Sequence, residues 1–180
     1  EHYKLFFISA LNGKESHILL DVLKEDIHYK TLVKTPVGSS FLKETGTPVM
    51  VTTPDFNNIL GDKLTAFAPT TTGIPYIKKD KEMGMEIIKQ MYDVGCLFDE
   101  IDDISMVKDV FKAFAAIELE YRGNTHTISD VLDDTFYTAL AVCFRKNIQN
   151  TNFTVLNNGI ISIKSYIFSD SFHLDKAVTY

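Results

Sequence analysis

The chain contains little cysteine and little arginine, and each scarcity excludes a class of protein. Only two of its 180 residues are cysteines, Cys96 and Cys143, which stand singly and indicate neither a disulfide framework nor a zinc knuckle. No two of the five histidines are spaced as zinc ligands on one helix. With two arginines, Arg122 and Arg145, and a net charge of −6, a strongly basic nucleic-acid surface is not expected.

Long apolar runs, internal repeats and glycine-rich phosphate loops are also missing. No uninterrupted apolar stretch is long enough to cross a bilayer, and no Gly-x-Ser-x-Gly elbow is present. At 45% hydrophobic and 23% charged residues, the chain can nevertheless bury a real core. We therefore expect a soluble protein without a membrane partner, and the cysteine usage fits a reducing cytoplasm.

The hydrophobic period changes near residue 53, which predicts an α+β fold. Strand-like segments come first, at residues 3–9, 16–24, 29–33 and 48–53, with a turn at Asn12-Gly13. Helical periods follow, at about 54–67, 85–100, 103–122, 127–146 and 155–168. We predict a sheet over residues 1–53, a helical domain over 54–180, and a cleft between the two parts.

Several helix ends are marked in the sequence. Thr53 is a candidate N-cap with Pro54 at the first helical position of the first helix. Thr127 and Asp130 are spaced as a capping box, and an i,i+4 ion pair is expected between Glu118 and Arg122.

Lys63 falls within the apolar stripe of the first predicted helix. An ammonium among core-facing residues either reaches water along its own stem or meets an anion, because an isolated buried charge costs several kcal/mol. Both outcomes remain open from the spacing alone. The loop that follows this helix, with Thr70, Thr71 and Thr72 between two prolines, offers hydroxyls that could donate to a phosphate.

Two further groups of charged residues stand out. Lys89 and Asp93 lie one turn apart on the polar side of the second helix, and spacing alone favours a surface ion pair between them. Lys78, Lys79 and Lys81 form the one local basic cluster, which is a candidate RNA contact or a solvated loop.

Asp21 is the strongest single candidate in the strand region. It shares a strand face with Leu19, while Ile18 and Leu20 point the other way, so both faces are apolar. We therefore expect a central strand covered on both sides. A carboxylate there needs a metal, a cation or several donors, although a structural ion pair would also satisfy it.

Together these segments resemble the nucleotidyl transferase AbiEii/AbiGii toxin family, part of the DNA polymerase beta-like nucleotidyltransferase superfamily. "ILLDVL" is similar to the strand of the third carboxylate, at Asp21, and "DKLTA" to the lysine helix, at Lys63. "KQMYDV" is similar to the Arg/Lys-Asp-x-x-Asp-Leu motif, at Lys89 and Asp93, and "VLNNGIISIKSYI" to the closing helical segment. The resemblance covers most of the chain.

The resemblance implies a metal-dependent nucleotidyltransferase of a type IV toxin–antitoxin or abortive-infection system. Asp21, Lys63 and Asp93 would be catalytic, with Asp21 on Mg²⁺ and Lys63, Lys89 and the three threonines at the nucleotide. The implied partners are a nucleoside triphosphate, a tRNA or protein acceptor, and a cognate antitoxin.

The chain also departs from the family pattern. Gln90 stands where many members have the first aspartate of the motif, and Lys89 where arginine is commoner. The family's Gly-Ser and Asp-x-Asp motif is not found in residues 1–180, so we expect a fragment that would be inactive alone.

Two alternatives to the enzyme remain open. The first is a non-catalytic binding module that keeps the architecture. A thioredoxin-like fold, suggested by "GTPVMV", is less well supported because the chain has no Cys-x-x-Cys.

Overall fold

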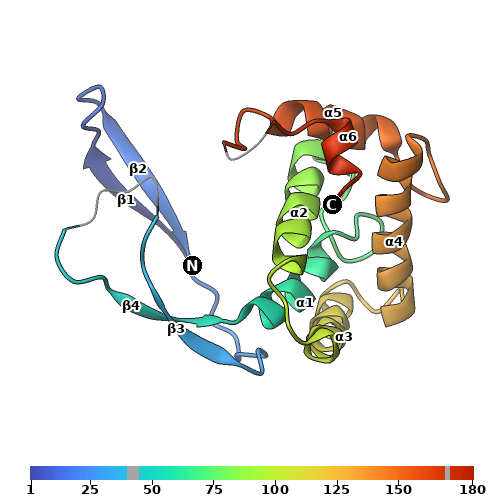
Figure 1. Cartoon of the computed structure of the whole chain (residues 1–180), viewed down its shortest axis with the longest axis horizontal. Coiled ribbons are helices and arrows are strands. Elements are labelled where there is room, and N and C mark those ends of the chain that lie inside the picture. Colours follow the sequence, from blue (N-terminus) through green and yellow to red (C-terminus); the bar gives the residue numbers. More distant parts are fainter. Residues whose placement is uncertain (40–44, 169–170) are drawn as a thin grey trace.

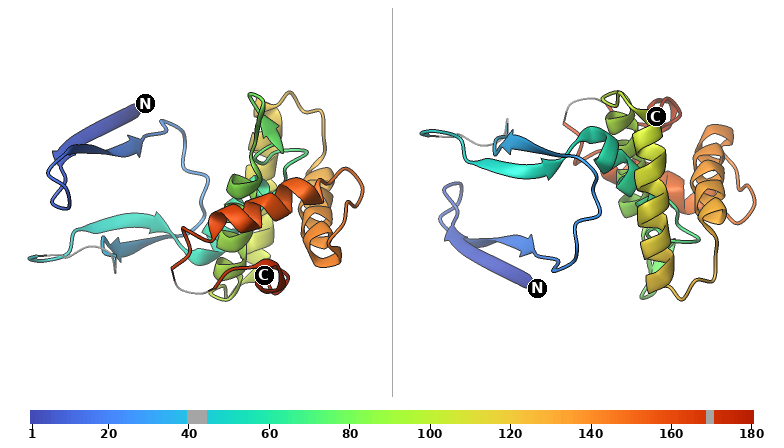
Figure 2. Two further views of the ribbon diagram at one scale, coloured as in Figure 1. Left: turned by 90° about the horizontal axis from the view of Figure 1, so that it is seen from above. Right: turned by 90° about the horizontal axis from the view of Figure 1, so that it is seen from below.

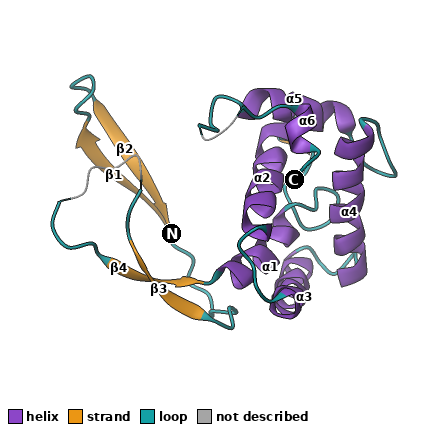
Figure 3. Cartoon of the chain, viewed as in Figure 1, coloured by secondary structure: helices purple, strands orange, loops and turns teal. Residues whose placement is uncertain are grey.

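The computed structural model describes residues 1–39, 45–168 and 171–180, and its elements confirm the α+β prediction (Figures 1 and 3). Two antiparallel hairpins come first and the helices follow, with a short third hairpin between the first two helices. The strands are β1 (His2–Ile8), β2 (Glu15–Asp21), β3 (Leu32–Pro36), β4 (Met50–Pro54), β5 (Ile77–Lys78) and β6 (Lys81–Glu82). The helices are α1 (Phe56–Ala66), α2 (Gly84–Phe98), α3 (Ile104–Tyr121), α4 (Ile128–Phe144), α5 (Phe153–Ile163) and α6 (Leu174–Ala177).

The β1–β2 hairpin corrects the expectation of a central strand. β2 pairs with β1 in a two-stranded sheet, and all seven of its residues are exposed. The alternation of the sequence shows which side chains share a face, but it cannot show whether another layer covers that face. One face is wholly apolar except at its Ser16 end, and its large side chains are each 45–59% exposed: Tyr3, Leu5, Phe7, Ile18 and Leu20.

The three sheets are each two-stranded, so the described part of the chain does not form a thioredoxin-like sheet. The β1–β2 and β3–β4 hairpins lie to one side of the helices in all three ribbon views (Figures 1 and 2). β5 and β6 form a short exposed hairpin, which places Lys78, Lys79 and Lys81 in a solvated turn. No helix among the described residues is long and apolar enough to cross a membrane.

The helices pack in pairs around the core. α1 lies against α3 and α2, while α2 lies against α5. The larger cluster buries the side chains of Phe67, Ile87, Ile88, Met91, Ala141, Val142, Leu156, Ile160, Ile163, Phe172 and Ala177. Gly84 and Gly159 let α2 and α5 approach closely, because a Cβ on Gly159 would lie 2.1 Å from the Gly84 carbonyl oxygen.

One predicted helix cap and one predicted ion pair are confirmed, and the other predicted cap is wrong. Thr127 and Asp130 form the predicted capping box, and Glu118 pairs with Arg122. α1 instead begins after Asp55, whose carboxylate accepts the Asn58 N–H at 2.9 Å, while Pro54 ends β4. The prediction of Thr53 as the N-cap is wrong because Thr53, Pro54 and Asp55 are adjacent, and each is a residue type that often begins a helix.

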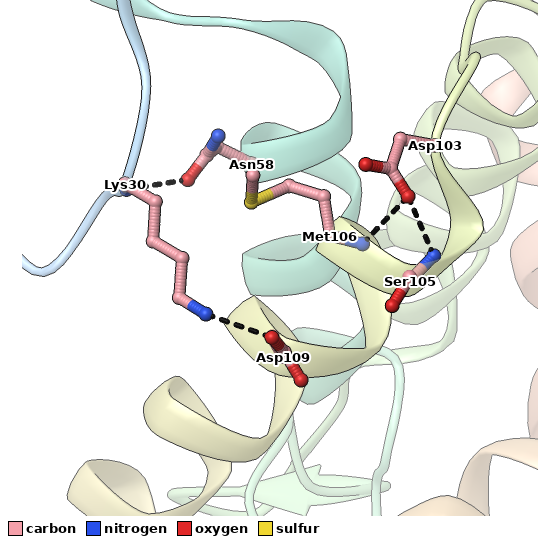
Figure 4. A network of polar contacts seen from close by, with 6 residues as sticks. All are labelled: Lys30, Asn58, Asp103, Ser105, Met106 and Asp109. Carbon is pink, nitrogen blue, oxygen red and sulfur yellow. Dashed lines mark hydrogen bonds and ion pairs between the residues drawn. The ribbon is translucent and has the colours of Figure 1, made fainter.

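Polar contacts join the segment between β2 and β3, residues 22–31, to helices α1 and α3 (Figure 4). The Lys30 backbone N–H donates to Asn58 Oδ1 at 2.8 Å, and Lys30 Nζ pairs with Asp109 Oδ2 at 2.9 Å. Asn58 is fully buried, whereas the Lys30 and Asp109 side chains are about half exposed. The hydrogen bond to Lys30 lowers the pKa of Asp109 below its usual value.

Asn58→Ala is expected to lower the free energy of unfolding by about 1–3 kcal/mol, because it leaves the Lys30 N–H without its buried acceptor. Lys30→Met keeps that backbone bond and removes only an exposed ion pair, so its expected cost is under about 1 kcal/mol. Urea unfolding of both variants measures the difference. Equal costs would contradict the assignment of the anchoring role to Asn58.

Candidate functional site

Lys63, Gln90 and Asp93 converge where α1 crosses α2. Lys63 Nζ lies 3.0 Å from Asp93 Oδ2 and 3.1 Å from Gln90 Oε1. The Lys63 and Asp93 side chains are 31% and 29% exposed, and Gln90 is buried. Of the two outcomes left open for Lys63, the structure therefore shows the meeting with an anion.

The local sequence explains this convergence. Gln90 and Asp93 are three residues apart on α2, so both face the same side of that helix. Gln90 supplies a neutral amide oxygen at the position where the motif more often has an aspartate. The cluster thus carries one negative and one positive charge, and Lys63 is not held between two carboxylates.

Lys89 does not pair with Asp93, although the spacing favoured that ion pair. Asp93 bonds Lys63 instead, and Lys89 forms no ion pair within the described residues. Lys89 is exposed and lines a cavity of about 420 Å³ together with Asp93. Lys63, Asp93 and Lys89 therefore occupy one region, with Asp93 shared by the cluster and the cavity.

The three threonines make contacts in other directions. The Thr70 N–H and the Thr71 hydroxyl donate to Asp134 Oδ2 at 2.8 and 2.9 Å, and the Thr72 hydroxyl donates to the Thr65 carbonyl at 2.8 Å. None of them lines the cavity of Lys89 and Asp93. Through Asp134, the Thr70 N–H and the Thr71 hydroxyl hold the loop to α4, and a phosphate at the Thr71 hydroxyl would compete with this buried carboxylate.

Asp21 lies in the β1–β2 hairpin, on a different part of the chain from the helical cluster. Its Oδ1 is 2.6 Å from His2 Nδ1, and its side chain is 68% exposed. Asp21 therefore has a side-chain partner in the same hairpin, which forms an ion pair when His2 is protonated, at a more open position than the sequence suggested. No group of three His, Cys, Asp or Glu side chains in the described ranges could hold a metal.

The donor chemistry at Asp21 fits Mg²⁺ in part. Magnesium is commonly held by one or two carboxylates together with substrate phosphates and water. Asp21 offers one accessible carboxylate, which could serve as such a ligand when a triphosphate supplies other oxygens.

A second charged residue adjoins Lys63 in sequence. Asp62 accepts a hydrogen bond from the Tyr29 hydroxyl at 2.9 Å, and burial raises the pKa of the Asp62 carboxyl. The hydrogen bond and the Lys63 charge act in the opposite direction. Burial and the Asp62 charge also raise the pKa of Tyr29. Asp62 therefore ties the 22–31 segment to α1, while the Lys63 ammonium is directed to Asp93.

Residues 1–152 match the family model described as nucleotidyl transferase AbiEii toxin, type IV toxin–antitoxin system. The chain belongs to the AbiEii family. No curated protein and no solved structure matches it. AbiEii proteins are nucleotidyltransferases of type IV toxin–antitoxin systems, so a nucleotide substrate and an antitoxin partner are properties of the family.

Sequence reasoning overlooked the contribution of Gln90. It treated this residue only as a departure from the AbiEii motif, whereas the buried amide is a direct acceptor for Lys63. The available signal was the three-residue spacing to Asp93, which places both side chains on one helical face.

Proposed function

We propose that this protein transfers a nucleotide from a nucleoside triphosphate to an acceptor hydroxyl, as the toxin of a type IV toxin–antitoxin pair in the cytoplasm. The observation that carries the proposal is the Lys63–Asp93 pair beside the Lys89-lined cavity, in a chain of the AbiEii family. The acceptor is a tRNA or a protein, and a cognate antitoxin is the regulatory partner.

Nucleotidyl transfer places particular demands on the protein. The acceptor hydroxyl loses its proton to water, its oxygen bonds to the α-phosphorus, the bond from that phosphorus to the bridging oxygen breaks, and pyrophosphate leaves with the electron pair. Positive charge near the phosphates stabilises the negative charge that develops in this step. Bound Mg²⁺ would supply Lewis acidity toward the phosphate oxygens, with Asp21 as its ligand from this chain.

Lys63 and Lys89 fit the demand for positive charge. Lys89 is exposed at the edge of the cavity, where its ammonium can reach phosphate oxygens as a mobile point charge. Lys63 is already held by Asp93 and Gln90, so it is positioned before substrate binds. In this proposal Asp93 is a positioning residue, which fixes the Lys63 ammonium beside the cavity.

The test uses the full-length protein with Mg²⁺, total tRNA and each of the four α-labelled nucleoside triphosphates in turn. Label on RNA or on protein identifies both the nucleotide and the class of acceptor. Asp21→Asn is expected to abolish the label with the melting temperature nearly unchanged, because Asp21 is exposed. The matched control is Asp26→Asn, at another exposed carboxylate in the segment that follows β2.

No transfer with any nucleotide, together with no Mg²⁺-dependent nucleotide binding, would favour a non-catalytic module. The observation that supports a non-catalytic module is Gln90, which stands where many family members have an aspartate. Transfer that survives Asp21→Asn at full rate would remove Asp21 from the metal site and leave the transferase assignment standing.

A further inference from the structure

The cavity beside the Lys63 cluster has one charged edge and one apolar wall. It lies between α2 and the C-terminal end of α5, and its volume of about 420 Å³ is within the usual range for a small-molecule site. The charged edge comes from Glu86, Lys89 and Asp93 on α2. The apolar and aromatic wall consists of Met85, Tyr92, Ile163, Tyr166 and Ile167.

The two tyrosines of this wall differ in their surroundings. Tyr92 packs against Phe172, edge to face with ring centroids 5.5 Å apart, and against Tyr180 at 5.3 Å. These contacts hold Tyr92 as part of the wall. Tyr166 follows α5, where its backbone N–H donates to the Ile163 carbonyl at 2.9 Å, and the residue is 66% exposed.

We propose that this cavity is the nucleobase subsite, with the Tyr166 ring as a stacking surface for the base. The inference rests on the proposed transferase function. A nucleoside triphosphate has a flat aromatic end and a polyanionic end, and this cavity offers an aromatic wall next to the Lys89 and Lys63 ammonium groups. Asp93 connects the two ends, because it lines the cavity and bonds Lys63.

Base stacking on an aromatic ring does not depend on the identity of the base, since every base presents a π face. The subsite therefore accounts for binding of nucleotides as a class. It also assigns a binding role to the segment after α5, which extends from the helices on the side where the hairpins lie (Figure 1).

The experiment compares a nucleoside triphosphate with inorganic tripolyphosphate, which has the phosphates but lacks the base. Binding to the full-length protein is measured by calorimetry in Mg²⁺. Tyr166→Ala is expected to weaken nucleotide binding about 5- to 150-fold, the range expected for loss of one stacked base. Tripolyphosphate binding is expected to be unchanged, and Tyr166→Phe should retain nucleotide affinity within about 2-fold because the ring remains.

Tyr121→Ala is the matched control, since Tyr121 is 65% exposed on α3 and does not line this cavity. Wild-type affinity for nucleotide in Tyr166→Ala, or an equal loss for nucleotide and tripolyphosphate, would overturn the subsite and leave the transferase proposal intact. Failure of the wild-type protein to bind either ligand would instead overturn the transferase proposal, and the subsite with it.

Discussion

Lys63→Met is expected to lower the rate of nucleotidyl transfer about 100-fold or more, the typical cost of removing one preorganised donor to a developing charge. The side chain of methionine is similar in length but uncharged, so the phosphates lose a fixed ammonium while the helix keeps a good helix former. Because the Lys63–Asp93 pair is only about one-third exposed and the buried Gln90 amide loses its donor, the expected loss of unfolding free energy is about 1–3 kcal/mol. Labelled-nucleotide transfer and urea unfolding measure the two quantities.

Lys108→Met, on an exposed position of α3, is the control for loss of one positive charge. It should leave transfer within about 2-fold, because Lys108 does not line the cavity and its exposed charge is screened by salt. The transfer rate of Asp93→Asn should lie between those of Lys63→Met and Lys108→Met, since Lys63 keeps its charge but loses its ionic partner. Unchanged transfer in Lys63→Met would show that the cluster at the α1–α2 crossing is only structural.

Gly159→Ala is expected to destabilise the protein by about 3 kcal/mol, at the upper end of the costs of overpacking. The added Cβ would lie 2.1 Å from the Gly84 carbonyl oxygen and 2.3 Å from its carbonyl carbon. Both atoms are backbone, so α2 and α5 would have to separate. At an exposed helical site the same substitution would stabilise the helix by about 1 kcal/mol. A loss of stability would therefore indicate that α2 and α5 are in close contact at Gly159.

Ser162→Ala, an exposed position on the same helix, serves as the comparison and should change the unfolding free energy by less than about 0.5 kcal/mol. Chemical unfolding of both variants gives the measurement. A stabilised Gly159→Ala protein would mean that α2 and α5 do not cross as closely as described, and the cavity wall formed by the end of α5 would lose its support.

Local patterns in the sequence predicted the elements well. The change of period near residue 53, the Asn12-Gly13 turn and the Thr127 capping box are each determined by neighbouring residues, and all three are found in the structure. Pro54 was misplaced because a strand end and a helix start meet there. The division into domains at residue 53 stays a prediction.

The contacts of the candidate site could not be predicted in the same way. Lys63 and Asp93 are 30 residues apart, and periodicity indicates the face on which each lies without indicating which faces meet. Lys89 therefore seemed the natural partner of Asp93 at i,i+4. The threonine loop was similarly ambiguous, because a hydroxyl such as that of Thr71 suits a phosphate as well as the Asp134 carboxylate that it contacts.

The apolar face of the β1–β2 hairpin determines the concentrations at which this chain can be studied. Tyr3, Leu5, Phe7, Ile18 and Leu20 present a continuous apolar surface, and a two-stranded sheet has an open edge on each side. Such surfaces associate with one another, and association grows with protein concentration. Apparent specific activity should therefore fall as the preparation is concentrated, and rates measured at high dilution will be the ones that describe the single molecule.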